Sequence, residues 1–307
     1  MNNIKIIGNG YYLPKRKIEN SYFFNKMNIN DEYIYKRSGI KTRYFVKDET
    51  IEEMAIIASR KAIENAKINE NDIDMIIVAT TSSDKMMPGI SYKIQKELKI
   101  NECICLDILA GCGGFINALD IARNYISLNK IKKAIIVGVD ILSKCFKEND
   151  LSVGFILSDG AGAIIVENSE KEYYSYIISD GKNGDILTYI SGEDIYMDGT
   201  KVYKYAVKET VENIRKLLKN ANIELNEIKY IVPHQSNAKI MNAIANRLGI
   251  ETDKMISNIE NVGNTFCASI PIAINKLFEK KDLKSGDRII LLGYGGGLNT
   301  GSILLEI

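Results

Sequence analysis

The sequence has little histidine and cysteine, the residues that bind structural zinc. His234 is the only histidine among 307 residues, and the five cysteines form no CxxC pair. A structural zinc site takes four such ligands, usually in closely spaced pairs, so this composition excludes one. Three roles remain for the imidazole of His234: acid or base catalysis, a hydrogen bond to a substrate, or packing in the interior.

Strong charge of one sign, long apolar runs and a leader sequence are also missing. The formal net charge is +1, so nucleic acid is not expected as a main partner. No apolar run reaches the about 18 residues that a membrane span needs. The start MNNIKIIGNGYYLP lacks the basic end and the cleavage site of a signal peptide. We therefore expect a cytoplasmic protein with no membrane segment, whose cysteines are free thiols.

Short apolar runs alternate with segments of helical period along the chain. With 46% apolar and 26% charged residues, the composition is that of an ordinary globular protein. No Ser/Gly linker separates the segments, so we expect an α/β fold whose parts pack closely. Period and composition predict strands at 75–80, 103–109, 134–142, 163–167, 230–234, 288–294 and 302–307, and helices at 51–67, 113–128, 203–220, 236–248 and 267–279.

The chain also contains a faint internal repeat. In one pair of segments, a helix end is followed by a turn and a strand. In a second pair, a glycine corner is followed by a helix and a strand. General similarity among α/β units is the alternative explanation. If the repeat is a duplication, two halves, 1–168 and 169–307, pack face to face and bring their strand-to-helix corners together. The paired segments are 66–79 with 221–234, and 108–138 with 259–293.

Cys112 lies at a sharp corner between a strand and a helix. Small residues flank it in ILAGCGGF, and a helical pattern follows. This corner resembles the nucleophile elbow of hydrolases, and the free amides at a helix start favour a thiolate. We therefore interpret Cys112 as a nucleophile with a lowered pKa, which iodoacetamide should label ahead of the other cysteines. For those four, a buried apolar role is expected.

Three further glycine-containing segments need an interpretation. Asn264 lies at a corner like that of Cys112, although helix capping is the alternative role for an asparagine there. The run GYGGG (293–297) is followed by a strand, not a helix, so it is not a dinucleotide loop and instead indicates close approach of the backbone to a ligand. The segment SDGAGA (158–163) predicts a tight turn between strands.

Taken in order, these motifs resemble the β-ketoacyl-acyl-carrier-protein synthase III family of thiolase-like condensing enzymes. The resemblance covers essentially the whole chain. It implies a duplicated αβαβα fold, usually in a homodimer, which agrees with the faint repeat. The motifs that carry it are IIGNGYYLP, DEYIYKRSGIKTRYF (31–45), VATTSS (78–83), the Cys112 corner, SDGAGA, VPHQSN (232–237), GNT (263–265) and GYGGG.

The resemblance implies two half-reactions at Cys112, which together start fatty acid synthesis. The thiolate takes the acyl group of an acyl-CoA or acyl-carrier-protein primer, while backbone amides of Cys112 and Gly296 hold the oxyanion. Malonyl-acyl carrier protein then loses CO2. His234 and Asn264 donate hydrogen bonds to the resulting enolate, which attacks the acyl-Cys. This chemistry needs no metal and no redox cofactor.

The resemblance also implies how the thioester carriers bind. Tyr33 takes the place of a Trp that stacks on the CoA adenine in many relatives, and Arg37 and Asn237 match positions that bind CoA or its pantetheine arm. Leu151 replaces an arginine of the family. An isobutyl group cannot contact a phosphate, so an acyl-carrier protein could load the enzyme instead of CoA.

Basic residues are expected to attract the acidic carrier protein. Lys239 and Arg247 match basic positions of the family, and Lys204, Lys208 and Arg215 lie on a helix nearby in sequence. Solvated helix faces are the alternative reading of such residues. We interpret Lys239 and Arg247 as docking residues.

The acyl pocket differs from that of the relatives at two places. Met87 takes the position of a residue, commonly aromatic, that closes the partner's acyl pocket across the dimer. A flexible thioether there predicts medium or branched primers as well as acetyl. The segment 192–196 is shorter than the loop that walls the tunnel in well-known members.

Two other kinds of function stay open. A ketosynthase III-like starter enzyme or acyltransferase of polyketide or secondary metabolism would use the same Cys112. Simple acyl transfer needs no pair of enolate donors, so the presence of both His234 and Asn264 argues against it. A non-enzymatic scaffold would leave the glycine corners and the single histidine unexplained.

Overall fold

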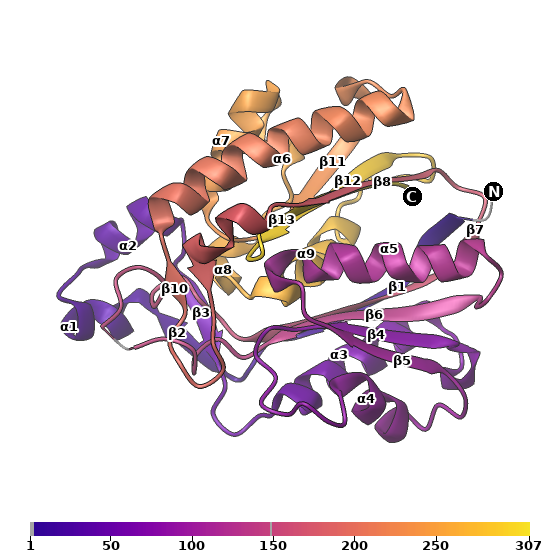
Figure 1. Cartoon of the computed structure of the whole chain (residues 1–307), viewed down its shortest axis with the longest axis horizontal. Helices are drawn as coiled ribbons and strands as arrows, with labels where there is room; N and C mark the ends of the chain where they lie inside the picture. Colours follow the sequence, from indigo (N-terminus) through magenta and orange to yellow (C-terminus); the bar gives the residue numbers. More distant parts are fainter. Residues whose placement is uncertain (1–2, 148) are drawn as a thin grey trace.

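Two sheets with helices between them and on their outer faces make up the protein (Figure 1). The computed structural model describes residues 3–147 and 149–307. Helices, sheet, helices, sheet and helices follow one another in layers, which is the αβαβα order that the resemblance implies. The described part of the chain begins and ends at the end of the molecule that is opposite to α1 and α2 (Figure 1).

The first sheet has the strand order β1-β7-β6-β4-β5, with β5 at one edge. Its central strands β4 and β6 are buried along almost their whole length, because helices or the second layer cover both faces. Helices α3 (Ile51–Ala66) and α4 (Ile90–Leu98) pack on its outer face. The strands are β1 (Asn3–Tyr12), β4 (Met75–Ala79), β5 (Ile104–Ile108), β6 (Lys133–Asp140) and β7 (Gly160–Ser169).

The second sheet has the order β11-β12-β13-β8. The long amphipathic helix α6 (Gly199–Ala221) covers its outer face, and α7 (Ala238–Leu248) packs against α6. The strands are β8 (Tyr173–Ser179), β11 (Ile228–Pro233), β12 (Arg288–Gly295) and β13 (Asn299–Glu306).

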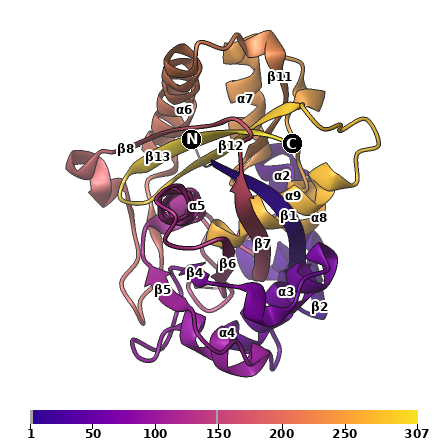
Figure 2. The same ribbon diagram turned by 90° about the vertical axis from the view of Figure 1, so that its right-hand side faces the viewer.

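Two helices fill the space between the sheets. Figure 2 shows α5 (Gly114–Ser127) end-on between them, and α9 (Ser269–Phe278) contacts strands of both. Seven of the ten residues of α9 are buried, as expected for a helix with sheets on both sides. Each of these helices follows directly on a short 3-10 turn, Gly111–Gly113 before α5 and Phe266–Ala268 before α9. The first turn is the Cys112 corner noted in the sequence, and the second follows directly on the corner at Asn264.

Short elements gather at one end of the layers, near α1 and α2 (Figure 1). A two-stranded sheet pairs β2 with β3, and another pairs β9 with β10. These elements are α1 (Phe24–Met27), α2 (Asp31–Ser38), α8 (Ile259–Val262), β2 (Arg16–Glu19), β3 (Thr42–Phe45), β9 (Leu187–Thr188) and β10 (Tyr196–Met197).

The strands and helices predicted from apolar period are present, whereas the predicted turn at 158–163 is wrong. Gly160 begins β7, and the strand continues through Ala163 and beyond. The glycines serve packing instead: a Cβ on Gly162 would lie 2.7 Å from the backbone nitrogen of Ile272 in α9. The helix can therefore approach this strand closely only where side chains are absent.

The strands of the two sheets come from different parts of the chain. All strands of the first sheet lie between residues 3 and 169, and all strands of the second lie between 173 and 306. The halves 1–168 and 169–307 stay a prediction, because β7 runs one residue past their boundary and helices α5 and α9 each contact both sheets. Within the described residues, none of the helices combines the length and the apolar character needed to span a bilayer.

Candidate active site

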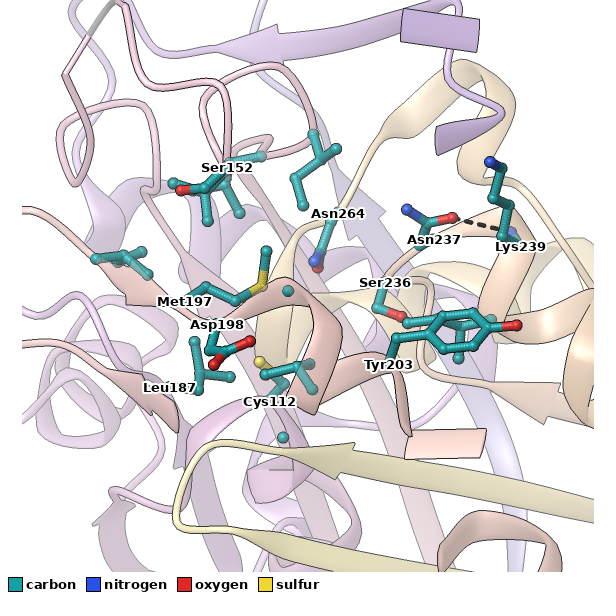
Figure 3. A pocket seen from close by; sticks show the side chains of 18 of the residues that line it. Cys112, Ser152, Leu187, Met197, Asp198, Tyr203, Ser236, Asn237, Lys239 and Asn264 are labelled. Atoms are coloured by element: carbon teal, nitrogen blue, oxygen red, sulfur yellow. Dashed lines mark hydrogen bonds between the residues drawn. The ribbon is translucent and has the colours of Figure 1, made fainter. Parts of the chain in front are cut away.

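A cavity of about 810 Å³ brings together residues from both halves of the chain. Cys112, His234 and Asn264 all line it, so the structure places the three predicted catalytic residues around one space. Figure 3 shows Cys112 and Asn264 directed toward each other across this space. All three side chains are almost fully buried.

The Cys112 corner depends on glycines on both sides. The φ angle of Gly111 is +56°, in the left-handed region, and a Cβ there would lie 2.5 Å from the carbonyl oxygen of Gly296. On the other side of the thiol, a Cβ on Gly295 would lie 2.7 Å from the Cβ of Cys112. The GYGGG run therefore does approach closely, and what it approaches is the nucleophile corner.

The electrostatic surroundings of Cys112 differ from our prediction. Burial raises the pKa of its thiol above the ordinary value, and the carboxylate of Asp140 raises it further. The backbone amides of Gly296 and of Cys112 itself lower this pKa, but by less. The prediction of a lowered pKa is therefore wrong for the free protein. The thiol lies in a buried 3-10 turn, where loss of hydration outweighs the amides that it faces.

His234 follows β11 and is held as a neutral ring. Burial lowers its pKa from 6.5 to about 3, so the imidazole carries one proton at neutral pH. Its Nδ1 lies 2.6 Å from Oγ of Ser269, and that oxygen also accepts a hydrogen bond of 3.3 Å from the backbone nitrogen of Gln235. Because that oxygen already accepts from Gln235, we assign the Ser269 hydroxyl as the donor to Nδ1, a direction that the distance alone leaves open. The ring proton is thereby assigned to Nε2, which serves as a hydrogen-bond donor.

Asn264 is oriented by its own turn. Its backbone is fixed by hydrogen bonds to Ile156 and from Ser158, of 2.9 and 2.8 Å. Its Oδ1 accepts a hydrogen bond of 3.0 Å from the backbone nitrogen of Phe266, in the manner of a capping residue. Because this bond uses the oxygen, the Nδ2 hydrogens are left for the cavity that Asn264 lines. The capping alternative and the donor role are thus compatible.

Comparison with known proteins gives the family. Residues 106–181 match the family described as 3-Oxoacyl-[acyl-carrier-protein (ACP)] synthase III, and residues 218–307 match the family described as its C terminal part. The beta-ketoacyl-[acyl-carrier-protein] synthase III of Clostridium perfringens (strain SM101 / Type A) is 37% identical over 324 residues, which cover 100% of each chain. The chain belongs to the 3-oxoacyl-[acyl-carrier-protein] synthase III family.

Solved structures of synthase III proteins agree with this assignment. The crystal structure of 3-oxoacyl-[acyl-carrier-protein] synthase III from Aquifex aeolicus VF5 has a TM-score of 0.96 and 36% identity, with 99% of this chain and 100% of that chain covered. The priming beta-ketosynthase from the R1128 polyketide biosynthetic pathway has a TM-score of 0.93 and 28% identity, with 99% and 96% covered. The predictions of the family and of the thiolase-like fold are confirmed.

The mouth of the cavity in this synthase III chain carries part of the predicted carrier-binding set. Arg37, Leu151, Asn237 and Lys239 all line it. The guanidinium of Arg37 lies 3.9 Å from the centre of the Tyr33 ring, so the two side chains are stacked. Asn237 donates a 3.0 Å hydrogen bond to the carbonyl of Arg37 and accepts one of 2.9 Å from the backbone of Lys239, which caps α7. Tyr33 itself is not among the lining residues.

Besides Tyr33, and Gly296 in the cavity described next, Arg247 and Met87 also lie away from this cavity. Arg247 is near the C-terminal end of α7, where its carbonyl accepts a 3.5 Å hydrogen bond from Arg215. Met87 is 87% exposed and lines neither this cavity nor the second one described next. The structure of one chain therefore leaves the docking role of Arg247 and the pocket role of Met87 as predictions.

A second cavity, of about 620 Å³, adjoins the first at Cys112. Met86, the neighbour of Met87, lines it and is 94% exposed. Both cavities share the thiol, so a thioester on Cys112 could reach the mouth on one side and the second cavity on the other. The residues lining both are Cys112, Leu187, Ile195 and Phe266.

Sequence reasoning missed two residues that orient the site. Ser269, at the start of α9, fixes the ring of His234. Asn299, at the start of β13, donates hydrogen bonds of 2.5 Å to the carbonyl of Ala110 and of 3.0 Å to that of Gly296. It therefore ties the chain before Cys112 to the glycine loop. An asparagine two residues after GYGGG is the one sequence signal for it.

Proposed function

We propose that this protein catalyses the decarboxylative condensation of an acyl thioester primer with malonyl-acyl carrier protein, the step that starts fatty acid synthesis. The observation that carries the proposal is a buried thiol that shares a cavity with two neutral hydrogen-bond donors, Nε2 of His234 and Nδ2 of Asn264. The family and its curated relatives named beta-ketoacyl-[acyl-carrier-protein] synthase III support it.

In the first half-reaction, the sulfur of Cys112 attacks the thioester carbonyl of the primer. The amides of Cys112 and Gly296, which face the sulfur, are placed to stabilise the negative charge on the carbonyl oxygen. The carrier thiolate leaves and takes up a proton, which balances the proton that the Cys112 thiol gives up. The products are the acyl-Cys112 thioester and the free carrier thiol.

In the second half-reaction, malonyl-acyl carrier protein replaces the departed carrier. Cleavage of the carbon-carbon bond to its free carboxylate releases CO2 and leaves an enolate, whose oxygen accepts hydrogen bonds from His234 and Asn264. The enolate carbon attacks the acyl carbonyl, and Cys112 leaves as a thiolate that regains its proton. The product is a β-ketoacyl thioester on the carrier protein. No step assigned to these residues calls on a metal or a redox cofactor.

The test separates the two half-reactions. Intact-mass measurement of the protein after incubation with a panel of acyl-CoA and acyl-carrier-protein primers reports acylation, and labelled malonyl-carrier protein reports CO2 release. We expect Cys112→Ala to abolish acylation, and His234→Ala and Asn264→Ala to retain it while losing decarboxylation. Normal CO2 release by His234→Ala would overturn the assignment.

The residues at the mouth of the first cavity indicate which carrier can bring the primer. We infer that Arg37, with Lys204 and Lys239 in the same lining, supplies the positive charge for a carrier phosphate, while Leu151 supplies none. An acyl-carrier protein is therefore a competent donor as well as acyl-CoA. Leu151→Arg should lower the KM for acyl-CoA and leave the KM for the acyl-carrier-protein donor nearly unchanged.

Docking of the carrier protein is assigned to Lys239 and Arg247 on α7. Their positive charges would steer an acidic partner to the mouth. Charge reversal by Lys239→Glu and Arg247→Glu should raise the KM for malonyl-carrier protein several-fold and weaken its dependence on ionic strength. Reversal at Lys281, outside both cavities, is the matched control.

A homodimer is proposed through the edge strand β5. Its outer edge has no partner strand in the part of the chain that the structure describes, and exposed apolar side chains occur on it and on neighbouring segments, which suits antiparallel pairing with a second copy. Light scattering should then give twice the chain mass of 34.4 kDa, and Ile104→Lys should shift it toward the monomer. The exposed apolar side chains are Met86, Met87, Tyr92, Ile104 and Leu109.

Primer range depends on this dimer. Met87 of one copy would close the second cavity of the other, so a flexible thioether leaves room for medium or branched primers. Met87→Phe should narrow the range toward acetyl.

Because the substrates are carrier thioesters of central metabolism, a cytoplasmic location is proposed. A starter ketosynthase of polyketide synthesis is the second candidate, which the likeness to the R1128 priming enzyme favours.

A further inference from the structure

A buried carboxylate lies behind the active site and contacts none of the three proposed catalytic side chains. Asp140 is the last residue of β6 and is fully buried. Its Oδ1 accepts four hydrogen bonds from the segment after β4: from Oγ1 of Thr80 at 3.2 Å, from the backbone nitrogen and Oγ1 of Thr81 at 2.8 and 2.9 Å, and from Oγ of Ser82 at 2.8 Å. This oxygen therefore anchors the segment to the end of β6.

The other oxygen of Asp140 reaches into the second half of the chain. Its Oδ2 accepts a 3.0 Å hydrogen bond from the backbone nitrogen of Cys267, in the turn that precedes α9. The preceding residue, Phe266, is the one whose backbone nitrogen orients Asn264. The carboxylate thus holds the turn one residue away from the bond that aims the proposed enolate donor.

The same turn also holds the nucleophile corner. Sγ of Cys267 lies 3.1 Å from the carbonyl oxygen of Gly111, the residue before Cys112, and donates to it. The turn sits directly on β6, since a Cβ on Gly138 would lie 2.0 Å from the carbonyl oxygen of Cys267. A chain of contacts therefore runs from Asp140 through Cys267 to the corners that carry Cys112 and Asn264.

The donors around Asp140 indicate its charge. Five N–H and O–H groups point at its two oxygens, and an ionised carboxylate can accept all of them, whereas a protonated one would direct a hydrogen at a donor. Among residues 3–147 and 149–307, no ion pair to Asp140 is found. Burial raises its pKa, and the hydrogen bonds oppose that effect.

We propose that Asp140 is a positioning residue, which sets the turn of Asn264 and the corner of Cys112 relative to each other so that the enolate forms within reach of the acyl-Cys. The inference rests on the proposed condensation and adds a residue to it. A buried carboxylate without a cation is costly unless hydrogen bonds compensate for its lost hydration, and five donors do so here. These donors come from both halves of the chain, and the reaction needs the Cys112 corner of one half and the Asn264 turn of the other at a fixed relative position.

Asp140→Asn is the direct test, because it keeps the shape and changes one acceptor into a donor. If the amide oxygen keeps the four donors of the segment after β4, the new NH2 group faces the backbone N–H of Cys267 and the turn is released. We expect CO2 release and condensation to fall about tenfold to a hundredfold in kcat, with the KM for malonyl-carrier protein nearly unchanged. Acylation of Cys112 should fall much less, because loss of the Asp140 charge also removes one cause of the raised pKa of its thiol.

A matched control is Asp74, which precedes β4 and lies beside the other end of β6. Asp74 accepts backbone hydrogen bonds of 2.6 and 2.9 Å from Lys132 and Lys133 where β6 begins, far along the strand from the corners. Asp74→Asn should keep the ratio of decarboxylation to acylation at the wild-type value. Equal changes of this ratio in both variants would overturn the proposal, as would a proportional fall of both activities in Asp140→Asn.

A milder variant covers the case in which Asp140→Asn does not fold. Ser82→Ala removes one of the four donors to Oδ1 and leaves the carboxylate in place. It should lower the ratio of decarboxylation to acylation by a smaller factor in the same direction, and an unchanged ratio in a folded Ser82→Ala protein would count against the proposal. The wild type is the reference: if it releases no CO2 from malonyl-carrier protein, the proposed function fails, not the role of Asp140.

Discussion

Lowering the pH should destabilise this protein through one imidazole. Burial lowers the pKa of His234 from 6.5 to about 3, whereas the unfolded chain exposes the ring to water. Between pH 6.5 and pH 3 the unfolded state therefore binds more protons, and the free energy of unfolding decreases as the pH falls through this window. The whole shift corresponds to about 5 kcal/mol, of which about 2 kcal/mol should be lost between pH 7 and pH 5.

Urea unfolding of the wild type and of His234→Gln isolates this contribution. Other groups titrate in the same range, including Asp159, whose pKa burial raises to about 6, but they are present in both proteins. The wild type should lose about 2 kcal/mol more than His234→Gln between pH 7 and pH 5. Above pH 7 the two proteins should show the same pH dependence, because the ring is neutral in both the folded and the unfolded state.

The single histidine also permits a direct measurement. In protein labelled with ¹³C and ¹⁵N at histidine, NMR should show one neutral ring with its proton on Nε2 at pH 7, and the same species at pH 5. A titration midpoint near 6.5, or equal loss of stability in the two proteins, would refute the reasoning. Either result would mean that the ring of His234 is hydrated or paired in a way that its burial and its bond to Ser269 do not allow.

Three further predictions concern the groups around the reacting atoms. Ser269→Ala removes the donor to Nδ1 of His234, so malonyl decarboxylation should fall about tenfold or more while acylation persists, and Ser269→Thr should restore it; equal loss in both variants would contradict the tautomer assignment. Because burial raises the pKa of Cys112, iodoacetamide labelling followed by peptide mass spectrometry should be slow at pH 7 and speed up toward pH 9; a rate independent of pH would be inconsistent with this. Asn299→Asp replaces the donor to the Ala110 and Gly296 carbonyls by a repelling carboxylate, so acylation should slow about tenfold or more, and normal acylation would exclude the bracing role.

The layers of the fold were predictable because their signal is local. The strand β4 is a run of five buried residues, and a strand with both faces covered must be apolar throughout. The corners at Cys112 and Asn264 were predictable for a similar reason. A short segment of sequence contains the whole pattern, which is a glycine next to a reactive or polar residue between a strand and a helix. The repeat supplied the expectation that such corners meet.

Other features depend on contacts that no short segment contains. The glycines at 160 and 162 read as a turn because a turn is the commonest use of closely spaced glycines, yet here they make room for α9, more than a hundred residues away in sequence. The raised pKa of Cys112 also depends on contacts between segments that are distant in sequence. A helix start is visible in the sequence, but the depth of burial that outweighs it is set by the second half of the chain.

The proposed reaction uses the single histidine as a neutral hydrogen-bond donor and not as a base. A general base at neutral pH would need a pKa near 7, and burial moves that of His234 in the opposite direction, to about 3. A neutral ring with its proton on Nε2 is instead a fixed donor, like the amide of Asn264, and its pairing with Ser269 keeps the proton on that side. In the proposed condensation, loss of CO2 from the malonyl thioester uses these two donors at the enolate oxygen and no base to remove a proton. The step therefore places a demand on hydrogen-bond geometry, which a buried ring held by Ser269 can meet.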